Sequence, residues 1–196
     1  MAQAYADRPF REVLAAFGSP SPTPGGGSAC AAAAALGTAL LRMGAGIANI
    51  DTQSLAHIEG RLIEAIDADA AAYTHVIGAQ RAPKDTDAER VLRTAAIQAA
   101  LRGATEVPLS ILRLCVSALF EAIEVATRAR RSTVGDMAVA VTLLRSAKNA
   151  AQLTVEANLS VLTDSQYVEN VRQELQVLSE RADNAAAEAE RLLRVR

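Results

Sequence analysis

Aromatic residues are scarce in this chain of 196 residues, which has no Trp, three Tyr and three Phe. This scarcity argues against an all-β sandwich, and it leaves few stacking platforms for single-stranded nucleic acid. Lysine occurs only twice, and 20 basic against 22 acidic residues give a net charge of −2. The chain therefore lacks the basic field that nucleic-acid-binding proteins present, and we expect no nucleic-acid partner.

Cysteine and histidine are also rare, with two residues of each. Cys30 and Cys115 lie in apolar stretches, which does not indicate a disulfide framework and favours a reducing compartment such as the cytoplasm. His57 and His75 are too far apart to share a metal ion, and no cluster has the spacing of metal ligands, so we expect no metal site. Residues 1–11 are polar and charged, unlike a signal peptide.

Alanine, the strongest helix former, supplies about a fifth of the residues. Apolar side chains recur at helical spacing, and the chain shows no strand alternation and no domain linker. These patterns predict one all-α domain over residues 1–196, an elongated bundle of six or seven helices, several of them long. Helices are expected at about 28–50, 52–80, 86–130, 136–162 and 165–196, with a kink or interruption at 103–108. Alanine-rich faces too broad for one core predict a homodimer.

The segment 29–50 is apolar over nearly the length that a bilayer requires. Arg42 lies near its middle, where a charge opposes membrane insertion, and the segment is built from Ala and Gly more than from Leu and Ile. We therefore expect a buried central helix and no membrane partner, with a membrane span as the alternative.

One low-complexity loop precedes this helix, and its end has the sequence Pro22-Thr23-Pro24-Gly25-Gly26-Gly27-Ser28. Glycines leave no side chain in the way of a ligand, and the first amides of a helix are unpaired at the positive end of its dipole. Such a tip suits a carboxylate, a phosphate or a polarised carbonyl. A simple turn is the alternative, because the loop matches neither a Walker motif nor a dinucleotide fingerprint.

The loop and the alanine-rich helix after it resemble the cyclodeaminase/cyclohydrolase family, which includes the cyclodeaminase domain of formiminotransferase-cyclodeaminase and stand-alone methenyltetrahydrofolate cyclohydrolases. The resemblance continues in order from about residue 10 to residue 164. It is carried by Asp-Ala-Ala-Ala-Tyr at 69–73, Ala-Pro-Lys-Asp-Thr-Asp at 82–87, Ala-Thr-Glu-Val-Pro-Leu at 104–109, Asp136 to Ala140, and Asn158 with Asp164.

The resemblance implies an all-helical homodimer that handles a one-carbon unit on tetrahydrofolate. Two reactions belong to the family: hydrolysis of 5,10-methenyltetrahydrofolate to 10-formyltetrahydrofolate, and cyclisation of 5-formiminotetrahydrofolate with release of ammonia. Hydrolysis needs a water beside a cationic carbon and a group that takes a proton, and a carboxylate suits both needs. No cofactor beyond the folate substrate is expected.

Two aspartates are the catalytic candidates. Asp136 follows Gly135 at an expected helix start, so helix capping is the alternative to a catalytic role. Asp69 lies amid apolar residues of a long helix, where a buried ion pair is the alternative. The candidate substrate-binding residues are those of the glycine loop and three others: Pro24, Gly25, Gly26, Gly27, Ser28, Tyr73, Lys84 and Asn158. Lys84 could equally be a solvated loop residue, and Asn158 could instead bridge helices.

Two departures from the family pattern leave other hypotheses open. Family members usually carry a Thr-x-Gly-Lys-Lys-like stretch after the glycine-initiated helix, but residues 48–54 here, Ala-Asn-Ile-Asp-Thr-Gln-Ser, contain no lysine. Of the usual Gly-Asn-x-Asn-x-Ile/Val-Ser-Asp run, only Asp136 remains. The alternatives are a divergent member that binds another small ligand, and a non-catalytic helical dimer that serves as a partner subunit.

Overall fold

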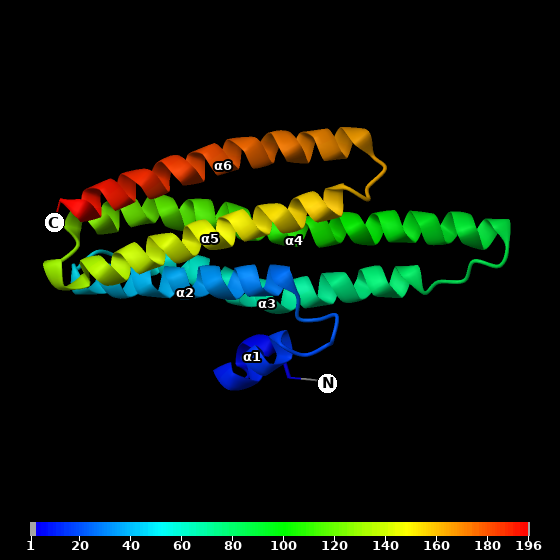
Figure 1. Ribbon diagram of the computed structural model, residues 1–196, viewed down its shortest axis with the longest axis horizontal. Coiled ribbons are helices and arrows are strands. Elements are labelled where there is room, and N and C mark those ends of the chain that lie inside the picture. Colours follow the sequence, from blue (N-terminus) through cyan, green and yellow to red (C-terminus); the bar gives the residue numbers. More distant parts are fainter. Residues whose placement is uncertain (1–2, 196) are drawn as a thin grey trace.

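The computed structural model describes residues 3–195 and contains six α-helices and two short 3-10 helices in that range. The elements follow one another as η1 (Tyr5–Asp7), α1 (Phe10–Phe17), α2 (Gly26–Ile47), α3 (Gln53–Gln80), α4 (Asp87–Arg128), η2 (Arg131–Thr133), α5 (Val134–Leu159) and α6 (Ser165–Arg194). No strand occurs within these residues. The prediction of an elongated all-α bundle with several long helices is confirmed (Figure 1).

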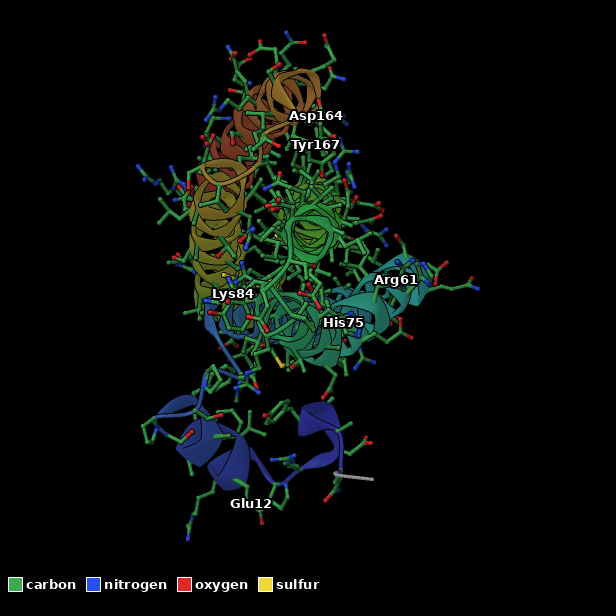
Figure 2. The ribbon with its side chains drawn as sticks, turned by 90° about the vertical axis from the view of Figure 1, so that its right-hand side faces the viewer. Glu12, Arg61, His75, Lys84, Asp164 and Tyr167 are labelled. Atoms are coloured by element: carbon green, nitrogen blue, oxygen red, sulfur yellow. The ribbon has the colours of Figure 1, made fainter. Side chains whose placement is uncertain are left out.

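Five long helices form the bundle. Helix α4 is the central one and packs against α2, α3, α5 and α6. Seen end-on in Figure 2, α4 lies in the middle, with α5 to its left, α6 above it and α2 and α3 below. Helices α2 and α5 run antiparallel in close contact. A side chain at Gly37 would begin 3.1 Å from the carbonyl oxygen of Ala140, and one at Gly44 would meet Met137. The small residues therefore let these two helices approach closely.

Helix α2 is long and apolar enough to cross a membrane by length and composition alone. In the bundle it contacts α3, α4 and α5, and half of its residues are buried. Leu41, for example, has no exposed surface, and the Thr38 hydroxyl donates to the carbonyl of Ala34. This packing agrees with the expectation of a buried central helix.

The sequence pattern predicts a kink or an interruption at residues 103–108. Helix α4 runs without a break through Pro108, so an interruption is wrong. Proline removes one backbone hydrogen bond and crowds the preceding turn, but a helix packed on four neighbours tolerates that cost. The start of α4 matches the sequence prediction closely. Thr86 and Glu89 form a reciprocal capping box, in which each side chain accepts from the backbone N–H of the other residue.

The N-terminal segment lies against the bundle at one point and extends away from it elsewhere. Asp67 on α3 accepts hydrogen bonds from the backbone N–H groups of Tyr5 and Ala6, at 2.7 and 3.2 Å. Helix α1, in contrast, buries no residue and stands apart from the other helices (Figure 1). Its Phe10 and Leu14 side chains are exposed.

Candidate functional site

A cleft of about 230 Å³ opens where α2 begins. Four helices and the loop before α2 contribute to its walls, so the cleft joins segments that are far apart in the sequence. The lining residues are Pro22, Gly25, Gly26, Gly27, Asp69, Tyr73, Ala104, Thr154, Ala157 and Asn158. The glycine loop, Asp69, Tyr73 and Asn158 are thus brought together, as their proposed common role requires.

The tip of α2 forms one wall of the cleft. Gly25 is the N-cap residue, and no protein group within residues 3–195 accepts a hydrogen bond from the amides of Gly26 or Gly27. The next amide, that of Ser28, donates to Oδ2 of Asp69 at 2.8 Å. The positive end of the helix dipole therefore holds one carboxylate of the protein and leaves two amides for a ligand.

Asp69 is held through one oxygen only. Its Oδ2 accepts from the amide and the hydroxyl of Ser28, while no protein donor within the described residues contacts Oδ1. Burial raises the pKa of Asp69 above its ordinary value, and the two hydrogen bonds from Ser28 counteract this only in part. A carboxyl with one free oxygen and a raised pKa is suited to exchange protons with a bound molecule.

The Ser28 side chain links α2 to α3 at two points, Ile66 and Asp69. Its hydroxyl lies 2.8 Å from the carbonyl oxygen of Ile66 and 3.0 Å from Oδ2 of Asp69. A hydroxyl has one hydrogen, and a carbonyl can only accept. When the Ser28 hydroxyl donates to Ile66, the contact with Asp69 is a hydrogen bond only if Asp69 carries the proton. The arrangement therefore accommodates both protonation states of Asp69.

Gly27 makes the approach of Asp69 to the helix tip possible. A Cβ atom at this position would lie 2.0 Å from Oδ1 and 2.5 Å from Cγ of Asp69. At Gly26, one residue earlier, a Cβ atom would meet nothing within 4 Å. Glycine is thus required at position 27 by packing within the protein, whereas the space beside Gly26 is open.

This difference yields a paired prediction. Gly27→Ala must displace Asp69 from the α2 tip, so we expect the free energy of unfolding to fall by about 1–3 kcal/mol. Gly26→Ala places the same methyl group in open space and is expected to leave stability unchanged or slightly higher. Urea unfolding of both variants measures the difference. Equal stability of the two variants would mean that Asp69 does not occupy the α2 tip.

The opposite wall of the cleft comes from α4 and α5. Asn158 donates from Nδ2 to the carbonyl oxygen of Ala104 at 2.9 Å, so it does bridge two helices, the alternative role considered for it from sequence. Thr154 and Ala157 line the cleft beside it. Tyr73, one turn beyond Asp69 on α3, is 46% exposed and offers an aromatic face to a ligand.

Cys30 lies just behind the cleft on α2 and is 4% exposed. Burial, together with the nearby carboxylate of Asp69, raises the pKa of the Cys30 thiol to about 11. It therefore remains a neutral thiol and is no nucleophile at neutral pH. Cys30 and Cys115 are both free thiols and both are buried. The sequence likewise does not indicate a disulfide framework.

Asp136 does not reach this cleft within one chain, so a single chain does not bring the two catalytic candidates together. It is exposed in the first turn of α5, and Thr133 is the N-cap residue of that helix. Asn158 follows 22 residues later on the same helix, about 33 Å away. The physical reason is that α5 is one continuous helix whose two ends cannot meet. The lysine-free segment 48–54 lies at that far end too, since Arg128 donates to the carbonyl of Asn49.

Three predicted binding residues, Pro24, Ser28 and Lys84, do not line the cleft. Pro24 and Ser28 are buried, and Pro22 takes the place expected for Pro24 in the wall. Lys84 is exposed on the loop between α3 and α4, at the end of the bundle that faces the viewer in Figure 2. Sequence reasoning missed Thr154, although it lies four residues before Asn158 and hence on the same helical face.

Comparison with known proteins gives consistent matches over most of the chain. A family model described as formiminotransferase-cyclodeaminase matches residues 9–177. A methenyltetrahydrofolate cyclohydrolase from Methylorubrum extorquens is 32% identical over 179 residues, which cover 84% of this chain and 86% of the relative. A formiminotetrahydrofolate cyclodeaminase from Thermotoga maritima, known from a crystal structure, shares the fold with a TM-score of 0.85 at 19% identity, covering 96% of this chain and 97% of that one.

Longer relatives match through one part of their length. The formimidoyltransferase-cyclodeaminase of Sus scrofa is 32% identical over 200 residues, which cover 94% of this chain and 37% of the relative. The protein of the same name from Rattus norvegicus is 36% identical over 128 residues, 65% of this chain and 24% of the relative. This chain thus spans little more than a third of the first of these proteins and about a quarter of the second.

Proposed function

Because the chain belongs to the formiminotransferase-cyclodeaminase family, we propose that it hydrolyses 5,10-methenyltetrahydrofolate to 10-formyltetrahydrofolate. The observation that carries this proposal is the half-buried Asp69 carboxyl, held by one oxygen at the α2 tip inside a cleft. The Methylorubrum extorquens relative supports the choice of hydrolysis, because the match covers more than four fifths of both chains. The reaction requires water and no cofactor beyond the folate.

The chemistry follows from the charge of the substrate. The methenyl carbon bridges N5 and N10 as part of a cationic amidinium group, so it is electrophilic and is attracted to a carboxylate. Oδ1 of Asp69 accepts a proton from a water molecule as the water oxygen bonds to this carbon. The resulting tetrahedral intermediate breaks its bond to N5, which takes up a proton, and the formyl group remains on N10. One proton is released overall.

The other walls of the cleft suit the remaining parts of the substrate. Tyr73 offers a ring against which a flat heterocycle can pack. The free amides of Gly26 and Gly27 suit a carbonyl oxygen or a carboxylate. Of the candidate substrate-binding residues, Lys84 is the one that we assign to the glutamate tail, because its loop follows α3 some two turns beyond Tyr73.

A second candidate function is the cyclisation of 5-formiminotetrahydrofolate with loss of ammonia. It is favoured by the Sus scrofa relative, whose match covers 94% of this chain. In this reaction N10 attacks the formimino carbon, and the leaving amino group must be protonated. A carboxyl whose pKa is raised by burial supplies that proton more readily than an ordinary one.

We also propose that the protein acts as a homodimer through the outer face of α2 and α5. Leu36, Met43 and Ile47 follow one exposed stripe of α2, and Val139 and Leu153 follow one exposed stripe of α5. The two stripes adjoin, since a side chain at Gly37 would begin 3.3 Å from Cβ of Leu143. A twofold axis across this apolar face pairs it with itself.

Such a dimer would complete the site. The cleft lies at one end of the α2–α5 face and Asp136 at the other. A twofold axis across the middle of the face exchanges its two ends, so that Asp136 of the partner subunit approaches the cleft of this chain. Our assignment of Asp136 as a catalytic carboxylate therefore depends on the dimer.

The dimer gives a direct prediction. Leu36→Asp puts a charge in the centre of the proposed interface, and we expect the variant to sediment as a monomer where the unaltered protein sediments as a dimer. Val177→Asp on α6 is the matched control, because Val177 is similarly exposed but lies on a helix that does not form this face. If Val177→Asp were a monomer and Leu36→Asp remained a dimer, the interface would lie elsewhere.

The catalytic proposal is tested by following the absorbance of 5,10-methenyltetrahydrofolate on addition of purified protein. We expect its loss to be accelerated well beyond the spontaneous rate. If no acceleration occurs, the same assay run with 5-formiminotetrahydrofolate, and with release of ammonia as the readout, tests the second candidate. Saturable folate binding without either reaction would identify a divergent member, and absence of binding would favour a non-catalytic dimer.

A further inference from the structure

Pro108 lies in the interior of α4 and leaves one backbone carbonyl without its helical partner. In an α-helix the N–H of residue 108 would donate to the carbonyl of residue 104, but proline has no N–H. That carbonyl belongs to Ala104, which is 7% exposed and lines the cleft. A buried carbonyl without a partner is costly, so another donor is required at this point of the cleft wall.

Asn158 supplies that donor. Its Nδ2 lies 2.9 Å from the Ala104 oxygen, so α5 provides the hydrogen bond that α4 lacks. Because a carbonyl oxygen only accepts hydrogen bonds, the Asn158 amide is oriented with its NH2 group toward α4. The other atom of the amide, Oδ1, has no protein donor within residues 3–195. Since Asn158 lines the cleft, this oxygen is available to a ligand.

We propose that Pro108 is a positioning residue: by freeing the Ala104 carbonyl, it fixes the Asn158 amide so that Oδ1 is presented as a hydrogen-bond acceptor to an N–H group of the substrate. This inference rests on the proposed function, because the donor we assign to it is an N–H or amino group on the reduced pterin ring. The ring has several such donors along its edge. An Asn free to rotate would offer a donor as readily as an acceptor, so fixing it selects for ligands that donate.

A double-mutant cycle on ligand affinity tests the proposal, with 5-formyltetrahydrofolate as the probe. In Pro108→Ala the restored N–H competes for the Ala104 oxygen and loosens the amide. We expect this variant to bind the probe about three- to tenfold more weakly, the value of one hydrogen bond, while its melting temperature stays the same or rises. In the Asn158→Ala background the same change should have no further effect, because there is no amide left to position.

Gly103→Ala is the matched control. It is a helix-surface change in the turn beside Ala104, where an added Cβ would meet nothing within 4 Å. We expect the affinity of this variant to equal that of the unaltered protein. Unchanged affinity in Pro108→Ala, or a loss that adds in full to the loss in Asn158→Ala, would overturn the proposal.

A second readout does not depend on the ligand. Hydrogen exchange of the Asn158 side-chain NH2 group, measured by NMR, should be slow in the unaltered protein and faster in Pro108→Ala. Equal exchange in the two proteins would show that Pro108 does not fix the amide. If the unaltered protein bound no folate, the proposed function would fail and the pterin donor with it, whereas this exchange measurement would still decide the positioning role.

Discussion

Replacing Asp69 by Asn is expected to lower turnover at least a hundredfold without reducing stability at pH 7. The amide keeps an oxygen for the Ser28 N–H but cannot take a proton from water, and general-base catalysis contributes about 10²–10⁴-fold. Steady-state rates of methenyltetrahydrofolate hydrolysis measure the loss.

The stability of Asp69→Asn has a definite dependence on pH. Burial raises the pKa of Asp69, so the folded state binds the proton more tightly than the unfolded state does. The stability that Asp69 contributes is therefore fully present below its ordinary pKa and is lost as the pH rises through the raised value. Asn carries no charge at any pH, so the variant should equal or exceed the unaltered protein at pH 7, and this advantage should vanish near pH 3.

Thermal unfolding at the two pH values checks this expectation. A fall of several degrees in the melting temperature at pH 7 would mean that the Asp69 carboxylate has a structural role at the α2 tip. The rate of hydrolysis should itself decline as the pH falls through the raised pKa, because only the ionised carboxylate accepts a proton from water.

The second large effect concerns Asp136. We expect Asp136→Asn to be inactive with an unchanged melting temperature, since the side chain is exposed in the first turn of α5. If Asp136 serves the cleft of the other subunit, two inactive variants should restore activity together. In a dimer of Asp69→Asn with Asp136→Asn, one of the two sites combines both intact aspartates. Random pairing makes half of all dimers mixed, so about a quarter of the normal activity should return.

Each variant refolded alone provides the control for this mixture. Activity of Asp136→Asn by itself would remove Asp136 from the catalytic assignment. Two inactive variants whose mixture stays inactive would mean that the aspartates do not act across a dimer, and the twofold arrangement of the α2–α5 face would then be wrong.

Much of the fold follows from local signals in the sequence. The capping box of Thr86 and Glu89 begins α4, and Asp164 accepts from the Tyr167 N–H at the start of α6, both at the predicted places. The break expected at Pro108 does not occur. Asn158 donates to the carbonyl that lost its helical bond, and it lies 50 residues away from Pro108 in the sequence, so no local pattern indicates it. Local rules describe what proline removes and cannot show what tertiary packing supplies.

The site was predictable to a similar extent. Gly25 to Gly27, Asp69, Tyr73 and Asn158, all singled out from the sequence as candidates, line one cleft. The length of α5 separates Asp136 from it, and Ser28 acts through Asp69 without lining the cleft itself. The full burial of Lys148, which pairs with Asp183 at 2.9 Å, had no signal in the sequence because the pairing joins two different helices.

A crystal structure of the protein with 5-formyltetrahydrofolate bound tests the central claim most directly. We expect the pterin ring in the cleft at the α2 tip, with its one-carbon substituent beside Oδ1 of Asp69 and the ring in contact with Tyr73. A folate bound at any other surface, with Asp69 still covered by Ser28 and the cleft filled only by solvent, would contradict the assignment of this site.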